Sequence, residues 1–397
     1  MKLIYLYSGG MQASGVQKKV VNKIKTLNQL GVETKGIFVA NTEKEVNYPD
    51  LNIKVVPYQI TNVPKIYSAP FFWRLHVYYE NKIFYDTLDK ALQKEDFDLI
   101  LFRYPIWYAD FNFLRFMKKY HKKIVFEHNT IETVEMKAYK REGFRQKYLL
   151  FNEKNVAPRA LKHAKGIIGV CKEITDYEIN RVGHKLTGQT ISNGFDVESV
   201  DVRTPPDYDQ KELRILFSSG FAGKWHGLDR LIEGLHLYKG DVNVKLQVIG
   251  NVMEEIHFLV EKYNLKDQVE FLGNMTNEEA SQVFDECHIA ASSMGMHRNG
   301  LQEAATLKTR EYLSRGIPFF ISNIDVDLVN NEFISFFYTK IPADDTPVSI
   351  EDIVNFTEQV MQNSQHAQDM RNFAKQNIDY QLKMNELKNF LEHLNTN

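Results

Sequence analysis

The chain has 397 residues, of which 43% are hydrophobic and 25% are charged, and this composition is typical of a folded globular protein. The formal net charge of −2 excludes a general electrostatic attraction to nucleic acid, so we expect no nucleic-acid partner. Because a chain of this length exceeds what one hydrophobic core usually organises, we expect two domains.

The two cysteines, Cys171 and Cys287, lie far apart in apolar surroundings and fit neither a disulfide framework nor a zinc site. The first residues, MKLIYLYSGG, contain too short an apolar run for a signal peptide. No stretch of the sequence approaches the roughly 20 apolar residues that span a bilayer. We therefore expect a cytoplasmic protein.

Short β-rich segments alternate with segments of helical periodicity along the whole chain. The expected strands, in chain order, are Lys2–Tyr7, Glu33–Val39, Asp98–Arg103, Lys123–Glu127, Gly166–Val170, Gln189–Ser192, Leu213–Ser218, Val244–Ile249, Val269–Leu272, His288–Ser292 and Ile317–Ser322. Continuous apolar runs such as LILF and IVF suit parallel strands that are buried on both faces. The alternation predicts an α/β architecture with two Rossmann-like domains.

The polar segment from Asp196 to Glu212, which contains Pro205 and Pro206, separates the two series of strands. The predicted parts are an N-terminal domain over 1–196, a C-terminal domain over 197–375 and a final helix over 376–397 that packs back on the first domain. Since open α/β sheets bind ligands at the carboxyl ends of their strands, we expect two facing domains with a cleft between them.

Two features of the first half are candidates for ligand contact. Gly9, Gly10 and Gly15 follow the first strand and allow a loop that passes close to a ligand, with the positive end of the next helix pointing there. His128 follows a buried strand, where an imidazole can touch a sugar hydroxyl. The alternatives are an ordinary tight turn and a histidine satisfied by a local backbone group.

The second half opens with a glycine-rich loop after its first strand. Gly220, Gly223 and Gly227 leave this loop free to wrap around a ligand, and Lys224 adds a compact positive charge. A cation beside the amides of a helix N-terminus suits a diphosphate group. The alternative is a solvated loop lysine.

Two glutamates, Glu303 and Glu311, stand eight residues apart around the start of a predicted helix. The amides of Thr306, Leu307 and Lys308 then lie at the positive helix end, between the two carboxylates. A ligand with hydroxyl groups at both ends and phosphates in the middle matches this layout, as a nucleotide sugar does. An exposed surface helix is the alternative.

Other segments of the sequence are candidates for a metal site, a membrane contact or an acceptor site. The pairs Asp96 and Asp98, and Asp325 and Asp327, invite a metal site, although no metal is expected. The segment Lys137–Lys165 carries nine Lys and Arg against two acidic residues, with aromatic residues between them, and can contact an anionic membrane or form a solvated helix face. The aromatic segment Phe71–Leu88 suits an acceptor site or a core.

Taken in order, these segments resemble the retaining GT-B glycosyltransferases of the family four group over nearly the whole chain. The similarity rests on the first loop, on His128 and on five further stretches, namely Ile191–Asp196, Gly220–Asp229, Val248–Gly250, Glu270–Gly273, and Glu303–Glu311 with Lys308, Tyr312, Gly316 and Pro318. The resemblance implies a GT-B fold and a nucleotide-sugar donor as substrate, with no cofactor.

The resemblance also implies roles for single residues. Glu311 is expected to hold the ribose hydroxyls, and Glu303 to contact the donor sugar. Lys224 and the amides from Thr306 to Lys308 are expected to bind the diphosphate. The sequence departs from the family's pattern at two places. His226 replaces a lysine of the family's diphosphate loop, and Glu-Ala-Ala-Thr, which begins at Glu303, replaces Glu-x-Phe-Gly.

Further roles follow for residues that border the donor and the transferred sugar. Residues near Gly250 and Asn274–Met275 would border the base, and Gly220 of the loop is expected to contact the donor nucleotide. His128 would touch the transferred sugar, while Gly10 and Gly15 would approach a phosphate or the acceptor.

The implied reaction is a retaining, metal-independent sugar transfer from a UDP-sugar, or a GDP-sugar, to a glycan or a lipid-linked acceptor of a surface polysaccharide. It places the chain at the inner face of the membrane. Two alternatives stay open at this point, a non-hydrolysing sugar-nucleotide epimerase and a non-catalytic glycosyltransferase-like subunit.

Overall fold

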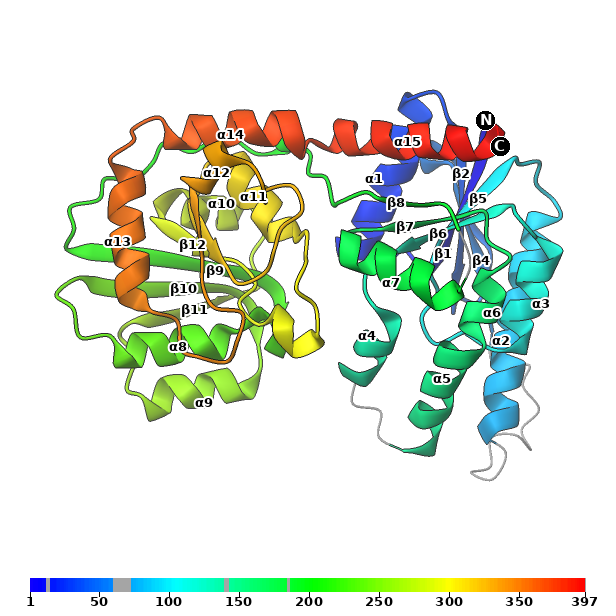
Figure 1. Cartoon of the computed structure of the whole chain (residues 1–397), viewed down its shortest axis with the longest axis horizontal. Coiled ribbons are helices and arrows are strands. Elements are labelled where there is room, and N and C mark those ends of the chain that lie inside the picture. Colours follow the sequence, from blue (N-terminus) through cyan, green and yellow to red (C-terminus); the bar gives the residue numbers. More distant parts are fainter. Residues whose placement is uncertain (12–14, 60–72, 139–142, 184–185, 397) are drawn as a thin grey trace. The chain divides into compact units, whose positions relative to one another are not determined.

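The chain folds into two compact units in a computed structural model that describes residues 1–11, 15–59, 73–138, 143–183 and 186–396. Unit 1 comprises Met1–Ile191 together with Met384–Asn397, and unit 2 comprises Ser192–Lys383. Figure 1 shows that each unit has a sheet with helices along it.

Unit 1 contains a sheet of eight strands among its described residues, in the order β3-β4-β2-β1-β5-β6-β7-β8, and every pairing is parallel except β3 with β4. Its elements are β1 (Lys2–Ser8), α1 (Gly15–Gln29), β2 (Glu33–Ala40), β3 (Val46–Tyr48), β4 (Ile53–Pro57), α2 (Trp73–Leu92), β5 (Leu99–Arg103), α3 (Phe111–Lys119), β6 (Ile124–His128), α4 (Glu132–Ala138), α5 (Phe144–Asn155), α6 (Ala157–Leu161), β7 (Gly166–Gly169), α7 (Lys172–Val182) and β8 (Gly188–Thr190).

The helix α15 (Tyr380–Thr396) begins in unit 2 and ends in unit 1. In unit 1 the Lys388 ammonium donates to the carbonyl of Leu30 at 2.9 Å. Gly166 gives this helix room, because a Cβ there would lie 2.7 Å from Leu394 Cδ1. The last turns of the chain are therefore part of the packing of unit 1.

Unit 2 contains a fully parallel sheet, with six strands in its described residues in the order β11-β10-β9-β12-β13-β14. Its elements are β9 (Glu212–Ala222), the 3-10 turn η6 (Lys224–His226), α8 (Leu228–Leu237), β10 (Asn243–Val252), α9 (Glu254–Lys262), β11 (Val269–Gly273), α10 (Asn277–Glu286), β12 (Ile289–Ala291), η7 (Met296–Asn299), α11 (Leu307–Arg315), β13 (Phe319–Ile321), α12 (Glu332–Ser335), β14 (Tyr338–Lys340), α13 (Ile350–Met361) and α14 (His366–Asn377).

Side chains point alternately to the two faces along each strand of unit 2, so the sheet has a hydrophobic core on each face. Along β9, Ile215 and Phe217 pack with α8, α9 and α13, whereas Leu216 packs with α10, α11 and α14. Figure 1 shows these two sets of helices around the sheet. Because both faces are covered, the strand ends are the places where a ligand can reach polar groups.

The boundary between the units lies near the predicted one, with the division after Ile191 instead of 196 and after Lys383 instead of 375. Backbone pairing accounts for the difference, because Phe195 forms a parallel bridge with Asp379 and so holds the start of the linker in unit 2. The Arg310 side chain also donates to the carbonyl of Asn193 at 3.0 Å.

The aromatic segment Phe71–Leu88 contributes mainly to the core of unit 1 where it is described. Its first two residues lie outside the described part of the chain, and α2 then buries Phe84, Tyr85 and Leu88 against the sheet. Among the described helices, none combines the length and the hydrophobicity that a membrane span requires.

Candidate active site

The start of α11 lies in unit 2, beyond the carboxyl end of β12. Thr306 caps the helix, and its hydroxyl accepts a hydrogen bond from the amide of Thr309. The hydroxyl of Ser292, just after β12, lies 2.8 Å from that of Thr309, so the first turn is tied to the end of the strand. Leu307, the first helical residue, is 44% exposed. The positive end of α11 is therefore fixed in position, at a strand end where ligands bind in such sheets.

The side chain of Lys308 places an amine beneath this helix end. Its Nζ is buried, has no hydrogen-bond partner among the described residues and lies 4.3 Å from the centre of the Phe217 ring. Burial lowers the pKa of Lys308 to about 7. Burial, and then the charge of Lys308, lowers the pKa of the neighbouring His226 to about 3. An anion bound here would supply the counter-charge that the protein does not.

The two glutamates predicted to flank the helix start lie where the sequence suggested. Glu311 is within α11, and its half-buried carboxylate accepts a hydrogen bond from Arg315 Nε at 3.0 Å. Glu303 precedes the helix and is half-buried, and its backbone forms an isolated parallel bridge with Ile324. One carboxylate therefore precedes the helix end and the other follows it along the chain.

The glycine-rich loop of unit 2 joins β9 to α8. Lys224 is exposed, and its carbonyl accepts hydrogen bonds from the amide of Gly227 and from Arg298 Nη1 at 2.8 Å. Gly220 is open, since a Cβ there would meet no atom within 4 Å. Lys224 is thus a solvated cation of the loop, in contrast to Lys308.

Gly250 and Met275, two further residues predicted to contact the donor, lie near the carboxyl ends of neighbouring strands. Gly250 lies in β10 with a φ of +101°, and a Cβ on it would lie 1.5 Å from the carbonyl oxygen of Ser219. Met275 follows β11 and is half-buried against the core. Because β11, β10, β9 and β12 are adjacent and parallel, the residues that follow them share one edge of the sheet.

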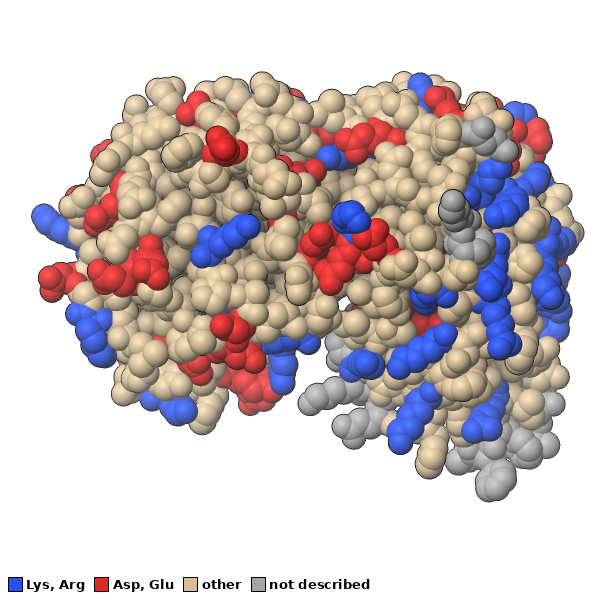
Figure 2. All heavy atoms as spheres, in the orientation of Figure 1, with Lys and Arg blue, Asp and Glu red and all other residues tan. Residues whose placement is uncertain are grey.

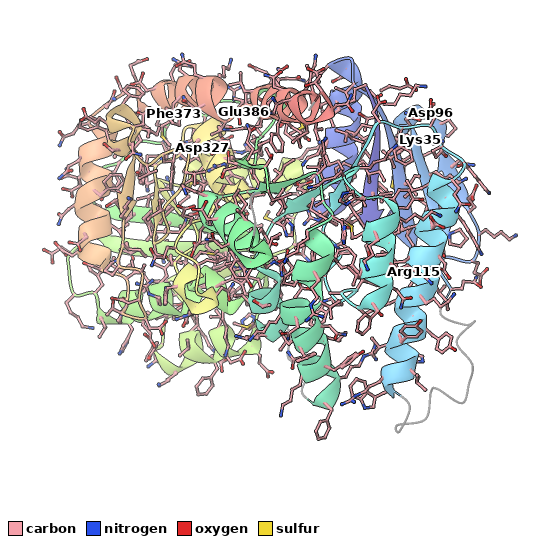
Figure 3. All side chains as sticks on the ribbon, turned by 45° about the vertical axis from the view of Figure 1, so that its right-hand side comes forward. Lys35, Asp96, Arg115, Asp327, Phe373 and Glu386 are labelled. Atoms are coloured by element: carbon pink, nitrogen blue, oxygen red, sulfur yellow. The ribbon has the colours of Figure 1, made fainter. Side chains whose placement is uncertain are left out.

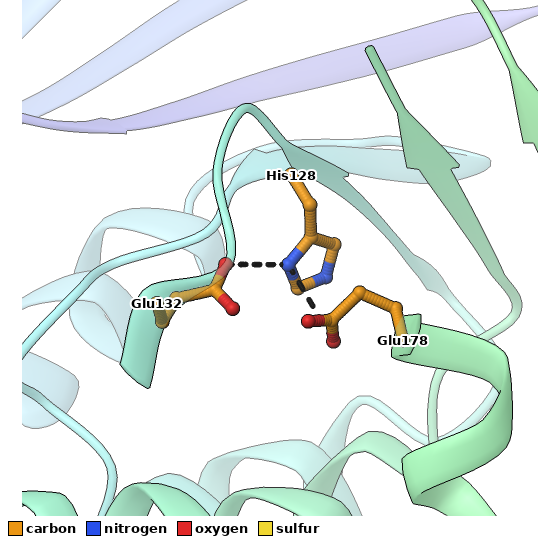
Figure 4. Close-up of side chains that lie close together, drawn as sticks. All are labelled: His128, Glu132 and Glu178. Atoms are coloured by element: carbon orange, nitrogen blue, oxygen red, sulfur yellow. Dashed lines mark hydrogen bonds and ion pairs between the residues drawn. The ribbon is translucent and has the colours of Figure 1, made fainter. Parts of the chain in front are cut away.

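His128 is the last residue of β6 in unit 1 and is fully buried. Its Nδ1 lies 2.7 Å from Glu132 and 3.6 Å from Glu178, as Figure 4 shows, and its ring stacks on Tyr104. Burial lowers the pKa of His128, which Glu132 partly opposes. A neutral imidazole that donates from Nδ1 leaves Nε2 as an acceptor, and this buried atom has no partner among the described residues.

The pKa values of the carboxyl groups around His128 shift in opposite directions. Burial opposes the ionisation of Glu132, but the contact with His128 and the charge of Arg181 outweigh it and lower the pKa of Glu132 to about 2. Burial, and then the charge of Glu132, raises the pKa of Glu178 well above its usual value. Arg181 lies 2.6 Å from Glu178 and 2.7 Å from Glu153, so one arginine is shared by several carboxyl groups.

Metal binding has one candidate group in the described part of the chain. His128, Glu132 and Glu178 offer ligand atoms that lie within 4.8 Å of one another. The guanidinium of Arg181 already contacts these carboxyl groups, so the protein provides its own cation at this position.

The aspartate pairs that the sequence left open as metal ligands are engaged elsewhere. Asp325 and Asp327 both form ion pairs with the buried Arg310, and Asp327, which is labelled in Figure 3, also lies 2.8 Å from Lys383 Nζ. Asp96 similarly forms an ion pair with a lysine, Lys2. Asp98 instead accepts a hydrogen bond from the backbone amide of Lys2 at 2.7 Å, so each of the four carboxylates has a partner in the protein.

The first glycine-rich loop is described only in part, because residues 12–14 lie outside the described chain. Gly10 lies close to β2, where a Cβ on it would be 3.3 Å from Ala40 Cβ. Gly15 is the first residue of α1, so the loop leads directly to a helix N-terminus.

The basic segment Lys137–Lys165 does not form a single helix. It covers the last turn of α4, then α5 and α6, while residues 139–142 lie outside the described chain. Phe144 and Phe151 of α5 are 79% and 60% exposed. Figure 2 shows many Lys and Arg side chains on the displayed face of unit 1.

Residues 205–377, which make up most of unit 2, match the sequence model of the family described as glycosyl transferases group 1. Unit 2 is a group 1 glycosyltransferase domain. The predicted membership of glycosyl transferases group 1 is thus confirmed for this unit. The helix start of α11, Glu303 and Glu311 all lie inside the matched range.

Solved structures of similar fold cover nearly the whole chain. Sucrose-phosphate synthase from Thermosynechococcus elongatus and the lipopolysaccharide outer core galactosyltransferase WaaB each match with a TM-score of 0.68 at 14% identity, over 99% of both chains. HepE from Anabaena in complex with UDP-glucose matches with a TM-score of 0.64 at 14% identity, over 99% of this chain and 100% of the other. A comparison with curated protein sequences gave no match. The predicted GT-B fold class is confirmed.

The buried position of the Lys308 side chain could not be predicted from the sequence, which suggested a role only for the backbone amide of this residue. In the glycosyltransferase domain this side chain lies under the helix start, while the cation that was predicted, Lys224, is exposed. The sequence contains little indication of this burial, because a lysine three residues before Glu311 resembles any exposed helix residue. Only the structure shows that its amine lies over the Phe217 ring. The partners of His128 were missed for the same reason.

Proposed function

We propose that the glycosyltransferase domain binds a UDP-sugar and that the chain transfers the sugar, with retention of the anomeric configuration, to a glycan or lipid-linked acceptor. The observation that carries this proposal is the buried, unpartnered ammonium of Lys308 at the start of α11. A diphosphate would accept hydrogen bonds from this group and from the first amides of the helix.

The diphosphate is the part of the donor that the helix start suits best. As the bond between the anomeric carbon and the β-phosphate oxygen breaks, negative charge grows on that oxygen. Lys308 and the helix dipole stabilise this charge, and the exposed Lys224 adds to it from the loop. The acceptor hydroxyl attacks from the same side and gives its proton to the departing phosphate oxygen, so neither a protein nucleophile nor a bound metal takes part.

The nucleoside and the sugar of the donor would extend to either side of the diphosphate. Glu311 would accept hydrogen bonds from the ribose hydroxyls, and Glu303 would accept them from the sugar. Gly250 and Met275 would border the base, and Gly220 leaves the loop able to close over the donor. Uracil is favoured because HepE, a protein of similar fold, was solved with UDP-glucose bound.

Unit 1 would then hold the acceptor. His128 has a buried acceptor atom, Nε2, without a partner among the described residues, and the loop from Gly10 to Gly15 adjoins the start of α1. The exposed Phe144 and Phe151, among the basic residues of α5, suit contact with an anionic membrane that carries a lipid-linked acceptor. A role in surface polysaccharide synthesis, at the inner face of the membrane, follows from this proposal.

The test of the donor site is calorimetric titration with UDP. Glu311→Gln removes the negative acceptor of the ribose hydroxyls, so we expect UDP affinity to fall at least about tenfold. Glu261→Gln on α9 is the matched control, since it alters an exposed carboxylate that pairs with Lys266. Equal UDP affinity in both variants would refute the ribose contact, and no binding by the unmodified protein would refute the donor proposal.

The reaction itself is tested with a UDP-sugar and a glycan acceptor, with and without a chelator. We expect the anomeric proton of the product to show retained configuration by NMR, at the same rate in both conditions. Loss of activity with the chelator would contradict the metal-independent mechanism. Conversion of the UDP-sugar without an acceptor would instead identify an epimerase.

A further inference from the structure

The face of the unit 1 sheet opposite His128 carries a second polar cluster. Glu127 and His128 are adjacent in β6, so their side chains point to opposite faces. The buried Glu127 carboxylate accepts hydrogen bonds from the Tyr5 hydroxyl at 2.7 Å, and lies 2.8 Å from Lys23 Nζ. Arg103, the last residue of β5, is the register partner of Glu127 and therefore points to the same face.

Two lysines contact this one buried carboxylate, and Arg103 acts on it electrostatically. Lys19 of α1 lies 3.6 Å from Glu127 and 2.7 Å from the side-chain oxygen of Asn129. Burial lowers the pKa of Lys19 to about 7; Glu127 opposes this shift, and the charges of Lys23 and Arg103 add to it. A single glutamate therefore does not balance the positive charge at this end of the sheet.

The guanidinium of Arg103 has an unsatisfied donor. Its Nη1 is buried and has no hydrogen-bond partner among the described residues. Glu135 of α4 is near enough to interact with it electrostatically, but burial raises the pKa of Glu135, and the two form no ion pair within 4.0 Å in the described chain. Burying an arginine donor without an acceptor is costly, so an acceptor from outside the protein would stabilise the site.

The position of the cluster matches that of a ligand site. Arg103 ends β5 and Glu127 nearly ends β6, at the edge where open α/β sheets bind ligands. Lys19 lies near the start of α1, whose first turn has no acidic residue, so the helix dipole adds to the positive potential. A cation near a helix N-terminus is unfavourable unless an anion is bound beside it.

We propose that unit 1 binds a phosphate group at this cluster, with Arg103 and Lys19 as its ligands. The planar guanidinium of an arginine can donate two parallel hydrogen bonds to phosphate oxygens. The Glu127 carboxylate already contacts two lysines, so it cannot accept both of these hydrogen bonds from Arg103. The assignment of this phosphate to the acceptor rests on the proposed function. The phosphate is carried either by a soluble phosphorylated sugar or by a lipid.

The first experiment measures binding of glycerol 3-phosphate to the full chain by calorimetry, with UDP present at saturation so that the donor site is filled. We expect Arg103→Gln to weaken binding about 10- to 100-fold. Arg115→Gln is the matched control, because Arg115 is an exposed arginine of α3 that pairs with Asp86 (Figure 3). If Arg103→Gln fails to fold, Lys19→Gln, whose side chain is 16% exposed, takes its place with the same expectation.

A second arm separates the two sources of the phosphate. Vesicles of phosphatidylcholine with and without phosphatidic acid are sedimented with the protein, and retention that depends on both phosphatidic acid and Arg103 indicates a lipid phosphate. Binding of glycerol 3-phosphate alone indicates a soluble one. Equal binding by the unmodified protein and Arg103→Gln in both arms, or no binding at all, overturns the proposal.

The UDP titration of the same preparations keeps this inference separate from the donor proposal. If UDP binds normally but no phosphate probe binds, the phosphate site is wrong and the donor site stands. If UDP fails to bind, the titration with glycerol 3-phosphate is repeated without UDP in the Lys308→Met variant. This variant lacks the amine at the start of α11, so phosphate binding there does not contribute to the signal.

Discussion

The amine of Lys308 is held in unit 2 where water is largely excluded and no protein anion is within hydrogen-bond reach among the described residues. Its pKa is lowered to about 7 by burial alone, against an ordinary value of 10.5. Between these two values the unfolded chain binds more protons at this residue than the folded chain does. The free energy of unfolding contributed by Lys308 therefore increases as the pH rises from about 7 to 10.5.

The variant Lys308→Met removes this ionisable group and keeps a chain of similar length over the Phe217 ring. We expect the stability of the ligand-free variant to rise less steeply with pH above 7 than that of the unmodified protein. Urea unfolding at several pH values measures the difference. Lys211→Met, which alters an exposed lysine, should leave the slope unchanged. An unchanged slope in Lys308→Met would contradict the burial of this amine.

The carboxyl groups beside His128 lead to a second residue-scale prediction, because Glu132 is ionised while the pKa of Glu178 lies well above its usual value. Because burial raises the pKa of Glu178, its ionised form is disfavoured, and we expect Glu178→Gln, which keeps the size of the side chain, to cost at most about 1 kcal/mol. Glu132→Gln removes the buried negative charge that faces His128 and Arg181, and we expect a loss of about 2–3 kcal/mol. Chemical unfolding at pH 7 ranks the two variants, and equal losses would contradict the assignment.

The sequence predicted several site residues but not their surroundings. His128 was identified from its place after a buried strand, and Glu303 and Glu311 from their spacing around a helix start. The contacts of Lys308 with Phe217, and of His128 with Glu178, join residues that are 91 and 50 positions apart in the chain. Such pairs depend on the strand order, which periodicity does not reveal.

At the scale of single elements, the approach of β9 to β10 requires a glycine at position 250. A Cβ there would lie 1.5 Å from the carbonyl oxygen of Ser219, and the φ of +101° is strained for any other residue. We expect Gly250→Ala to lower the free energy of unfolding by about 3 kcal/mol or more. Gly220→Ala, next to Ser219 in β9 but with open space around it, should change it by less than about 0.5 kcal/mol. Denaturant unfolding of both variants provides the comparison.

Each strand predicted from the sequence overlaps a strand of the structure, and the final helix expected over 376–397 corresponds to α15. The buried parallel strands were recognisable because both of their faces are apolar. Three strands were missed, namely β3, β4 and β14. They are short, and β4 ends at Pro57, so neither their length nor their composition separates them from loops.

At the scale of the whole molecule, the chain crosses between its two units twice, once near Ser192 and again within α15. The sequence indicated the first crossing through the polar segment with Pro205 and Pro206, but placed it slightly late. The cause is long-range, since the backbone bridge between Phe195 and Asp379 binds the linker to unit 2. No local composition marks the second crossing, because it lies inside a continuous helix.

The two parts of α15 should respond differently to substitution. Leu391 is fully buried in unit 1, and Leu391→Ala should lower the stability of that unit by about 2–5 kcal/mol. Leu382, which is 39% exposed on the same helix, should tolerate alanine with a change below about 0.5 kcal/mol. Hydrogen exchange locates the effect, and we expect the loss of protection in Leu391→Ala within 1–191. Equal loss in unit 2 would contradict this assignment.

The return of α15 to the first unit also constrains how the protein is made. During synthesis the strands of unit 1 leave the ribosome long before Leu387, Phe390 and Leu394, which bury their side chains in that unit. Domains usually fold as they emerge, but this one stays incomplete until α15 has been synthesised. Its nascent form therefore exposes an apolar surface throughout the synthesis of unit 2, and a chaperone that recognises such surfaces has that interval in which to act.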